Sequence, residues 1–311
     1  MFHHFHDHKI HKYGQGSINK DDLYKIIKFI GKKNILNANE FFTRFKENKL
    51  KNCNVCFTFD DGIKSQYDIA YPVLENENIK AFFFIYSSIF TGKPDLLEVH
   101  RYFRNTFYVN IDDFYEDFFK FFQKKNLKNF LERKKNQIKS FKKIFPHYSF
   151  KDIEFRFIRN ELISKKKYDL LMGKLFMKKK FRPKENFKHL FMSKEDIIKL
   201  HNTNHIIGLH SHSHPTLIEK LNLKQQENEY KKNLKILKKI LKNEKLLINT
   251  VSHPCGSYNK NTLSILKKIG VEMGFKQIMK FEKKRGMIKI NNSKLEIARQ
   301  DHSEIMRILN K

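Results

Sequence analysis

The sequence of 311 residues contains only three cysteines and no tryptophan. Cys53, Cys56 and Cys255 are an odd number of cysteines in a long chain, which argues against a fold held together by disulfides. Cys53 and Cys56 form a CxxC pair, but no second pair accompanies it to complete a zinc site of four cysteines. Because Cys56 falls within an apolar segment, burial is its expected role.

Long apolar runs are also absent. No segment reaches the length of about 20 apolar residues that a transmembrane helix needs. Residues 1–8 are rich in histidine and contain no apolar run resembling a signal sequence. The sequence therefore predicts a cytoplasmic protein.

Acidic residues are scarce relative to basic ones. The chain has 63 Lys and Arg against 33 Asp and Glu, which gives a formal charge of +30. A nucleic-acid or membrane-surface protein concentrates such charge in a patch. Here the lysines are spread along the chain and mixed with Asn, Ile and Phe, the bias that AT-rich codons produce. We expect no specific nucleic-acid partner and only weak attraction to anionic partners.

Short apolar runs and helical patterns make up most of the chain, whose 40% hydrophobic content is enough for a substantial core. The runs that predict buried strands are residues 55–59, 81–86, 205–209, 246–251 and, more weakly, 295–298. Between two of them, residues 230–241 repeat apolar side chains with the spacing of an amphipathic helix. Strands that alternate with helices predict an α/β fold with a largely parallel sheet.

Residues 110–182 have a different pattern. Phe114, Phe118, Phe121 and Phe122 keep helical spacing, and the residues that follow them are dense in lysine. We expect a helical insertion within a single domain that spans residues 1–311. The aromatic stripe is more typical of a core than of a ligand site, and a lid or a membrane-facing surface is the functional alternative.

Two adjacent carboxylates, Asp60 and Asp61, follow the first predicted strand and precede Gly62. Catalytic groups in α/β folds gather at the carboxyl ends of parallel strands. Neighbouring residues at a strand end point in different directions, so one carboxylate can bind a cation while the other acts as a general base. A solvated Asp-Asp-Gly turn is the alternative reading.

Two histidines, His210 and His214, follow the predicted strand at residues 205–209. Residues four apart in a helical turn share a face, so both imidazoles can reach one metal ion. Two histidines and one carboxylate leave open positions for water and substrate, as catalytic metal sites do. Because the chain contains 15 histidines, two histidines four residues apart are weak evidence of a metal site on their own. The evidence is stronger here because the pair follows a predicted strand.

A third motif, Ser252-His253-Pro254-Cys255-Gly256-Ser257-Tyr258, follows another predicted strand. A Pro-x-Gly turn at a strand end can direct backbone N–H groups towards a substrate carbonyl. Alone it would be an ordinary loop. Its position at a third strand end makes it a candidate part of the same site.

The three motifs TFDDG, HSHSHP and HPCGSYN, in this order, resemble those of the polysaccharide deacetylase family (NodB homology, carbohydrate esterase family 4). The resemblance covers about residues 53–90 and 190–302. It implies a distorted (β/α) barrel and a divalent metal, usually zinc, bound by Asp61, His210 and His214. It further implies that Asp60 is the general base and that the backbone N–H of Cys255 stabilises the oxyanion. His253, Pro254 and Gly256 would contact the substrate.

The sequence departs from the family pattern at two points. The arginine that orients the base would fall at Ser252, so Arg299 is the candidate substitute. The Leu-x-His motif, whose histidine protonates the leaving amine, is not clearly present. The candidates for this role are His302, His253 and, more weakly, His100. Among the N-terminal histidines, the family resemblance favours His3 or His4 near the site.

The resemblance implies a metal-dependent deacetylase that hydrolyses an N-acetyl group of a sugar in surface-polysaccharide or glycan-precursor biosynthesis. The expected substrates are an N-acetylated sugar, a sugar nucleotide or a lipid-linked glycan at the inner face of the membrane, with weak peripheral membrane contact. A catalytically weakened, deacetylase-like sugar-binding protein is the alternative. A nucleic-acid or membrane-surface protein is a second alternative, suggested by charge alone.

Overall fold

The computed structural model describes residues 1–7, 9–14, 16–144, 148–277 and 293–310. The chain divides into two compact units. The first, which we call the sheet unit, comprises Met1–His11, Ser17–Asp95 and Lys188–Lys311. The second, the helical unit, comprises Lys12–Gly16 and Leu96–Phe187. The expected insertion at residues 110–182 falls within the helical unit.

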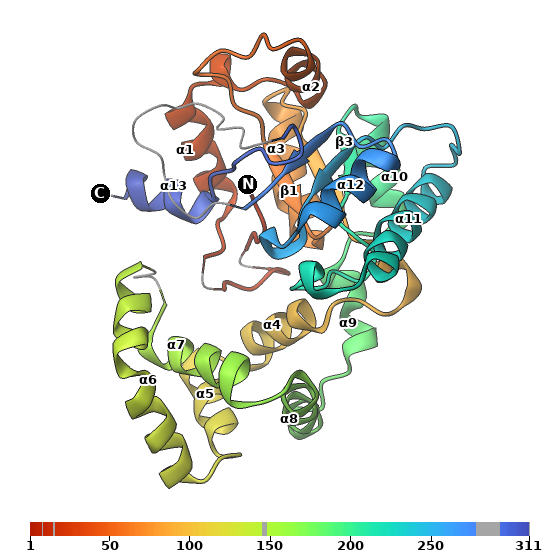
Figure 1. The fold of residues 1–311 in the computed structure, drawn as a ribbon. Coiled ribbons are helices and arrows are strands. Elements are labelled where there is room, and N and C mark those ends of the chain that lie inside the picture. The colour runs from red at the N-terminus through yellow and green to blue at the C-terminus, as the bar shows by residue number, and fades with distance from the viewer. Residues whose placement is uncertain (8, 15, 145–147, 278–292, 311) are drawn as a thin grey trace. The chain divides into compact units, whose positions relative to one another are not determined.

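Five short parallel strands form the sheet (Figure 1). In both chain order and spatial order they are β1 (Thr58–Asp60), β2 (Phe82–Ile85), β3 (Ile206–Leu209), β4 (Thr250–Ser252) and β5 (Met273–Phe275). Single bridges extend the sheet beyond both edges, from Phe59 to Phe2 and from Phe275 to Ile297. The sheet is a curled half-barrel, and its parallel strands bring their carboxyl ends to one side.

Both faces of the sheet are covered, and every strand residue except Ile206 is buried. In β2, Phe83 and Ile85 point into the larger core cluster, and Phe82 and Phe84 into the smaller one. The larger cluster is completed by α1 (Lys20–Ile30), α3 (Tyr71–Asn76), α10 (Lys194–Asn202), α11 (Leu223–Ile240), α12 (Lys260–Lys268) and α13 (His302–Leu309). The smaller is completed by α2 (Ala38–Lys46), and the half-buried Cys56 packs against it.

Capping boxes fix where several helices begin. In α1, α10, α11 and α12 the N-cap side chain accepts a hydrogen bond from the third helical N–H, and the third side chain accepts one in return. The N-caps are Asn19, Ser193, Asn222 and Asn259. Each box pairs backbone donors that a helix end leaves without partners.

The observed strands lie near the expected ones but differ in extent. The strand expected at 55–59 begins only at Thr58, because Val55 forms a single bridge with Ile35 instead. The strand expected at 246–251 is shifted to Thr250–Ser252. The strand expected at 295–298 is wrong, since this segment makes only the bridge at Ile297.

The strand β5, which occupies the sheet position beside β4, was not predicted from the sequence. Its middle residue is Gly274, and glycine is depleted in strands. A Cβ atom at Gly274 would lie 2.6 Å from the carbonyl oxygen of Leu295. The glycine therefore lets the segment around Leu295 lie directly against β5.

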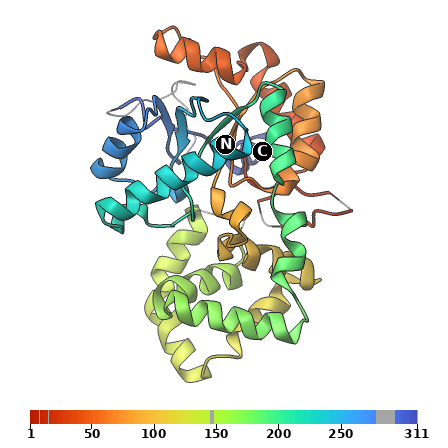
Figure 2. The same ribbon diagram turned by 90° about the vertical axis from the view of Figure 1, so that its right-hand side faces the viewer.

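The helical unit has an aromatic core. It contains α4 (Leu96–Phe107), α5 (Ile111–Phe119), α6 (Lys124–Ile144), α7 (Phe150–Phe157), α8 (Lys165–Lys178) and the start of α9 (Pro183–Leu190) (Figure 2). Phe114 and Phe118 are buried against Phe155, as the aromatic stripe predicted, whereas Phe121 is 37% exposed. Among the described helices, none combines the length and apolar character needed to cross a bilayer.

Candidate metal and catalytic centre

Asp61, His210 and His214 converge at the carboxyl ends of β1 and β3. The Nε2 atoms of His210 and His214 lie 3.1 and 3.2 Å from the same Oδ1 atom of Asp61. Two ligand atoms bound tetrahedrally to zinc lie about 3.4 Å apart, given zinc–ligand distances of about 2.1 Å. All three residues are buried. Their ligand atoms therefore have the spacing of a shared divalent cation.

The backbone turns sharply where these ligands leave their strands. Asp61 and Gly62 follow β1 with φ values of 77° and 64°, and Ser211 and His214 have φ values of 63° and 55°. Left-handed conformations of non-glycine residues cost free energy and are concentrated at functional sites. Here they turn the carboxylate and both imidazoles towards one point.

Each of the two histidines is oriented by a second hydrogen bond. His210 donates its Nδ1–H to the backbone carbonyl of Ser252 (2.8 Å), and His214 donates its Nδ1–H to Oδ2 of Asp95 (2.9 Å). Nε2 of each ring then carries the lone pair that a metal requires. Asp95 was not indicated by the sequence, because it belongs to none of the three motifs.

Two buried side chains of α11 hold the histidine loop. Oδ1 of Asn233 accepts the backbone N–H of His210 (3.0 Å), and Glu229 accepts the backbone N–H groups of His212 (2.9 Å) and Ser213 (2.7 Å). Glu229 and Asn233 are four residues apart on the buried face of α11, which also carries Tyr230, Leu237 and Ile240. In the sequence they are two polar residues among many, so neither was predicted, and their burial with hydrogen-bond partners marks their role only in the structure.

In this cluster the carboxylates favour protonated histidine and the histidines favour ionised carboxylate. Burial opposes ionisation of His214, but the carboxylates of Asp61 and Asp95 raise its pKa well above the usual value. Burial likewise opposes ionisation of Asp61, but His214 and His210 lower its pKa well below the usual value. A metal bound here would displace a proton from the cluster.

Asp60 has different partners from its neighbour Asp61. The guanidinium of Arg299 donates to both oxygens of Asp60, over 2.8 and 2.7 Å, and Ser252 Oγ donates to Oδ2 over 2.9 Å. Burial raises the pKa of Asp60, but Arg299 outweighs it and lowers the pKa to about 2. Asp60 is therefore ionised at neutral pH and fixed in one orientation. Arg299 thus contacts the carboxylate that the sequence analysis assigned as the base.

The third motif forms a turn after β4. Cys255 and Gly256 have φ values of 52° and 68°, and the Cys255 side chain is exposed. Its thiolate would lie close enough to His214 to raise the pKa of that imidazole. Pro254 is buried in the turn. The turn therefore places Cys255 beside the ligand cluster.

His253 lies on the inner side of this turn. It is 1% exposed, its Nε2 is bonded to the carbonyl of Leu295 (2.8 Å), and its ring stacks on Tyr258. Burial lowers the pKa of His253 to about 4. These contacts are those of a packed, neutral histidine, whereas the sequence analysis expected contact with the substrate.

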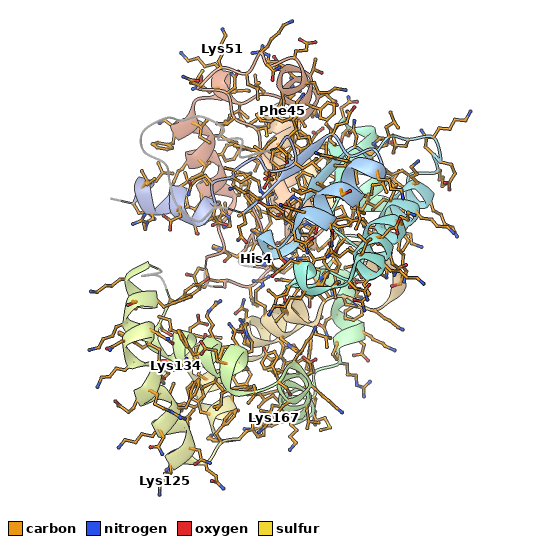
Figure 3. All side chains as sticks on the ribbon, in the orientation of Figure 1. His4, Phe45, Lys51, Lys125, Lys134 and Lys167 are labelled. Atoms are coloured by element: carbon orange, nitrogen blue, oxygen red, sulfur yellow. The ribbon has the colours of Figure 1, made fainter. Side chains whose placement is uncertain are left out.

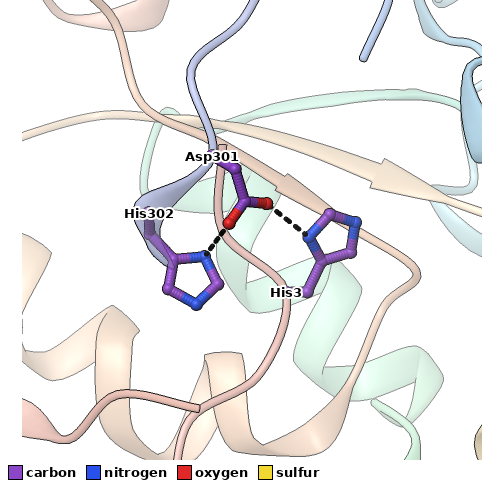
Figure 4. A group of neighbouring side chains, drawn as sticks. All are labelled: His3, Asp301 and His302. Carbon is purple, nitrogen blue, oxygen red and sulfur yellow. Dashed lines mark ion pairs between the residues drawn. The ribbon is translucent and has the colours of Figure 1, made fainter. Parts of the chain in front are cut away.

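His3, Asp301 and His302 form a second group of neighbouring side chains (Figure 4). Nδ1 of His3 lies 3.9 Å from Oδ2 of Asp301, and Nε2 of His3 lies 4.0 Å from Oδ2 of Asp60. The bridge between Phe2 and Phe59 holds the N-terminal segment alongside β1 and so sets this position. The side chain of His3 is 21% exposed, so its ring is open to solvent near Asp60.

The other candidate acids are enclosed. His302 is 3% exposed, with Nδ1 3.2 Å from the carbonyl of Met1 and its ring stacked on Phe2. His100 belongs to the helical unit, where burial lowers its pKa to about 3. Of the histidines named as acids or as N-terminal candidates, His3 has the geometry that fits best. The role of each site residue stays a prediction.

A match to a known protein family identifies the family of this chain. Residues 47–107 and 166–274, more than half of the chain, match the family model described as polysaccharide deacetylase. The chain belongs to the polysaccharide deacetylase family. The matched ranges include Asp60, Asp61, His210 and His214, but not Arg299 or His3.

Solved deacetylase structures share this fold. The deacetylase PplD of Streptococcus pyogenes, in complex with acetate, is 14% identical with a TM-score of 0.54 and covers 98% of this chain and 94% of its own. A de-N-acetylase from Aggregatibacter actinomycetemcomitans is 13% identical with a TM-score of 0.54, covering 96% and 92%. The BpsB deacetylase domain from Bordetella bronchiseptica is 12% identical with a TM-score of 0.51, also covering 96% and 92%. No curated protein matches the sequence. The expected α/β fold of NodB type, with its helical insertion, is confirmed.

Proposed function

We propose that this polysaccharide deacetylase family member is a metal-dependent hydrolase that removes the acetyl group from an N-acetylated sugar. The observation that carries the proposal is that two adjacent carboxylates have different contacts. Asp61 contacts two histidine Nε2 atoms, whereas Asp60 contacts the guanidinium of Arg299. Hydrolysis of an amide needs both a cation site and an ionised base, and the two carboxylates supply one each.

The donor set fits a divalent metal, and zinc is the candidate. Asp61, His210 and His214 would hold it, with Ser252 and Asp95 fixing the two imidazoles. Catalytic zinc sites with two histidine ligands and one carboxylate ligand leave a coordination position open for water or substrate. When bound, the metal supplies a Lewis acid for the acetyl carbonyl.

Asp60 is the proposed general base. Its two hydrogen bonds with Arg299 keep it ionised and hold it in one orientation, so it can accept a proton from the attacking water. A carboxylate whose pKa is this low is a weak base. The contribution of Arg299 is to hold the Asp60 carboxylate in a fixed orientation. Arg299 contacts Asp60 and not the reacting atoms, so its proposed role is positioning.

The amide carbonyl and the leaving amine need further groups. The backbone N–H of Cys255, at the turn beside His214, is the proposed donor to the oxyanion, a contribution of about 3–4 kcal/mol where such a donor is well placed. His3 is the proposed proton donor to the amine. Its ring is partly exposed and lies between the carboxylates of Asp60 and Asp301.

The form of the substrate and the location of the enzyme are further parts of the proposal. A surface polysaccharide, a sugar nucleotide or a lipid-linked glycan could each carry the N-acetyl group. Incubation of the purified protein with a soluble N-acetylglucosamine oligosaccharide, with UDP-N-acetylglucosamine and with a lipid-linked N-acetylglucosamine separates the three forms. The cytoplasmic location stays a prediction, which cell fractionation tests.

Acetate release tests the proposal as a whole. The protein is purified, loaded with Zn²⁺ and incubated with the three substrates, and free acetate and new primary amines are both measured. We expect equal amounts of acetate and amine from at least one substrate, and loss of both after chelation. Saturable sugar binding without acetate release from any substrate would favour the sugar-binding alternative.

A further inference from the structure

The helical unit contains a pocket of its own between α4, α5 and α7. It has a volume of about 280 Å³. This is close to the lower end of small-molecule sites, which measure about 300–1,000 Å³. Its walls include Arg101 and Arg104 of α4, Tyr115 of α5, and Asp152 and Arg156 of α7. All of its lining residues belong to the helical unit, so the pocket is defined without reference to the sheet unit.

Two of the three arginines have a carboxylate within hydrogen-bonding distance. Arg156 donates through Nε to Oδ2 of the buried Asp152 over 2.5 Å, and Arg101 donates through Nε to Glu98 over 2.9 Å. The other oxygen of Asp152, Oδ1, accepts the hydroxyl of Tyr115 over 2.6 Å. Both oxygens of Asp152 are thus already used.

Arg104 is the arginine with the weakest pairing. Its NH1 atom lies 3.9 Å from Oδ1 of Asp152, beyond hydrogen-bonding distance. Its Nε is buried and has no hydrogen-bond partner among the described residues. The guanidinium lies over the rings of Phe114 and Phe155, at 5.5 and 5.1 Å. Cation–π contacts offset part of the charge but do not satisfy N–H donors.

The surroundings add positive charge rather than remove it. Burial lowers the pKa of Arg159, and the nearby Arg156 and Arg104 add to this, although Tyr168 and Asp152 oppose it. Burial and then Arg104 also lower the pKa of His100. Burying the guanidinium of Arg104, whose Nε has no hydrogen-bond partner in the described part of the chain and whose carboxylate partner is also bonded to Arg156 and Tyr115, costs free energy that a bound anion would relieve.

We propose that this pocket binds a phosphate group, with Arg104 as its principal ligand and Arg101 and Arg156 beside it. Arginine binds phosphate through paired N–H donors in a fixed plane. A phosphate carries up to two negative charges, which suits a pocket that Arg101, Arg104 and Arg156 line and where the carboxylate nearest to Arg104 stands 3.9 Å away. The volume leaves space beside the phosphate for a small polar group such as a sugar.

Surface lysines provide a different and weaker attraction, which the test must separate from the pocket. Lys125 extends from α6 and Lys167 from α8, and both are exposed (Figure 3). Exposed charges such as these bind anions weakly, without saturation at one site and with strong screening by salt. A pocket ligand binds once per chain and depends on one arginine.

Calorimetric titration of the full chain with inorganic phosphate, at constant ionic strength, tests the proposal. We expect saturable binding of one phosphate per chain. Arg104→Gln should weaken it by at least about tenfold, the effect of losing charge-assisted hydrogen bonds of 1.5–3 kcal/mol. Arg133→Gln removes an exposed arginine of α6 and should leave the affinity unchanged. No saturable binding, or the same affinity in Arg104→Gln as in the wild type, would overturn the proposal.

Circular dichroism first establishes that Arg104→Gln is folded. If it is not, Arg104→Lys keeps the charge but loses the planar pair of donors, and it should also weaken phosphate binding. Glucose 1-phosphate and phosphatidylglycerol vesicles then distinguish a soluble phosphate ester from a lipid headgroup. Arg104-dependent binding of either supports the site, and Arg104-independent binding of all three probes contradicts it. None of these measurements uses acetate release, so the result stands apart from the proposed deacetylase activity.

Discussion

The guanidinium of Arg299 forms two hydrogen bonds, of 2.8 and 2.7 Å, with the carboxylate of Asp60, although 239 positions separate the two residues. Ser252 lies between them, donating to Asp60 over 2.9 Å and accepting from Arg299 over 2.8 Å. By resemblance to the family, an arginine would stand at position 252. The positioning contact is thus made here from the segment that precedes α13.

Replacement of Arg299 tests this positioning role. Arg299→Lys keeps a positive charge but cannot form the same planar pair of hydrogen bonds with Asp60. We expect kcat to fall by about 10- to 100-fold, the usual cost of losing an orienting partner, with little change in KM. Arg307→Lys alters an exposed arginine of α13 paired with Glu304 and should leave kcat unchanged. Wild-type kcat in folded Arg299→Lys protein would contradict the role.

Asp95 is expected to matter through His214. Asp95→Asn removes the charge that accepts the Nδ1–H of His214, so the imidazole is held less firmly and is a weaker ligand. Zinc affinity, measured by competition with a chelator, should fall by about 10- to 100-fold. Asp21→Asn, an exposed residue in the first turn of α1, is the matched control. Equal zinc affinity in both variants would show that Asp95 does not support the metal site.

His3 is expected to be needed only where the leaving group is poor. His3→Ala should lower kcat for an N-acetylated sugar by about 10²–10⁴-fold, because an amine must be protonated as it leaves. Hydrolysis of 4-nitrophenyl acetate should change little, because its phenolate leaves without a proton. His4→Ala changes the adjacent histidine and should affect neither substrate strongly. A similar loss on both substrates would indicate a structural role for His3.

Acid should destabilise the helical unit through His100. Burial, followed by Arg104, lowers the pKa of His100 to about 3 in the folded protein, against a usual value of 6.5. The unfolded chain therefore binds more protons between these values, and stability is lost as pH falls below about 6.5. At pH 5 the loss should be about 2 kcal/mol relative to pH 8, given 1.36 kcal/mol per pKa unit. Urea unfolding should show a smaller difference in His100→Gln, and an unchanged difference would contradict this cause.

The local part of the site could be read from the sequence. Asp60 ends β1, Asp61 and His210 directly follow β1 and β3, and His214 lies in the loop after β3, so an apolar run and the polar residues at its end suffice to place them. The parallel sheet then brings these strand ends together. Neither inference requires knowledge of contacts between distant segments.

The supporting residues could not be placed in this way. Asp95 and Asn233 reach the histidines from segments with no motif of their own, and His3 reaches Asp60 through a single bridge between Phe2 and Phe59. Such contacts depend on long-range packing, which hydrophobic periodicity does not encode. The sequence could name Arg299 as a candidate only because the family resemblance left a role vacant.

Metal content and turnover, measured together in two variants, test the central claim that Asp60 and Asp61 have separate roles. Asp60→Asn should retain zinc like the wild type and release no acetate, because the base is lost while the ligand cluster is intact. His210→Ala should lose the zinc itself and, with it, turnover. His189→Ala, which removes an exposed histidine of α9, should retain both. Full activity in either Asp60→Asn or His210→Ala would contradict the account.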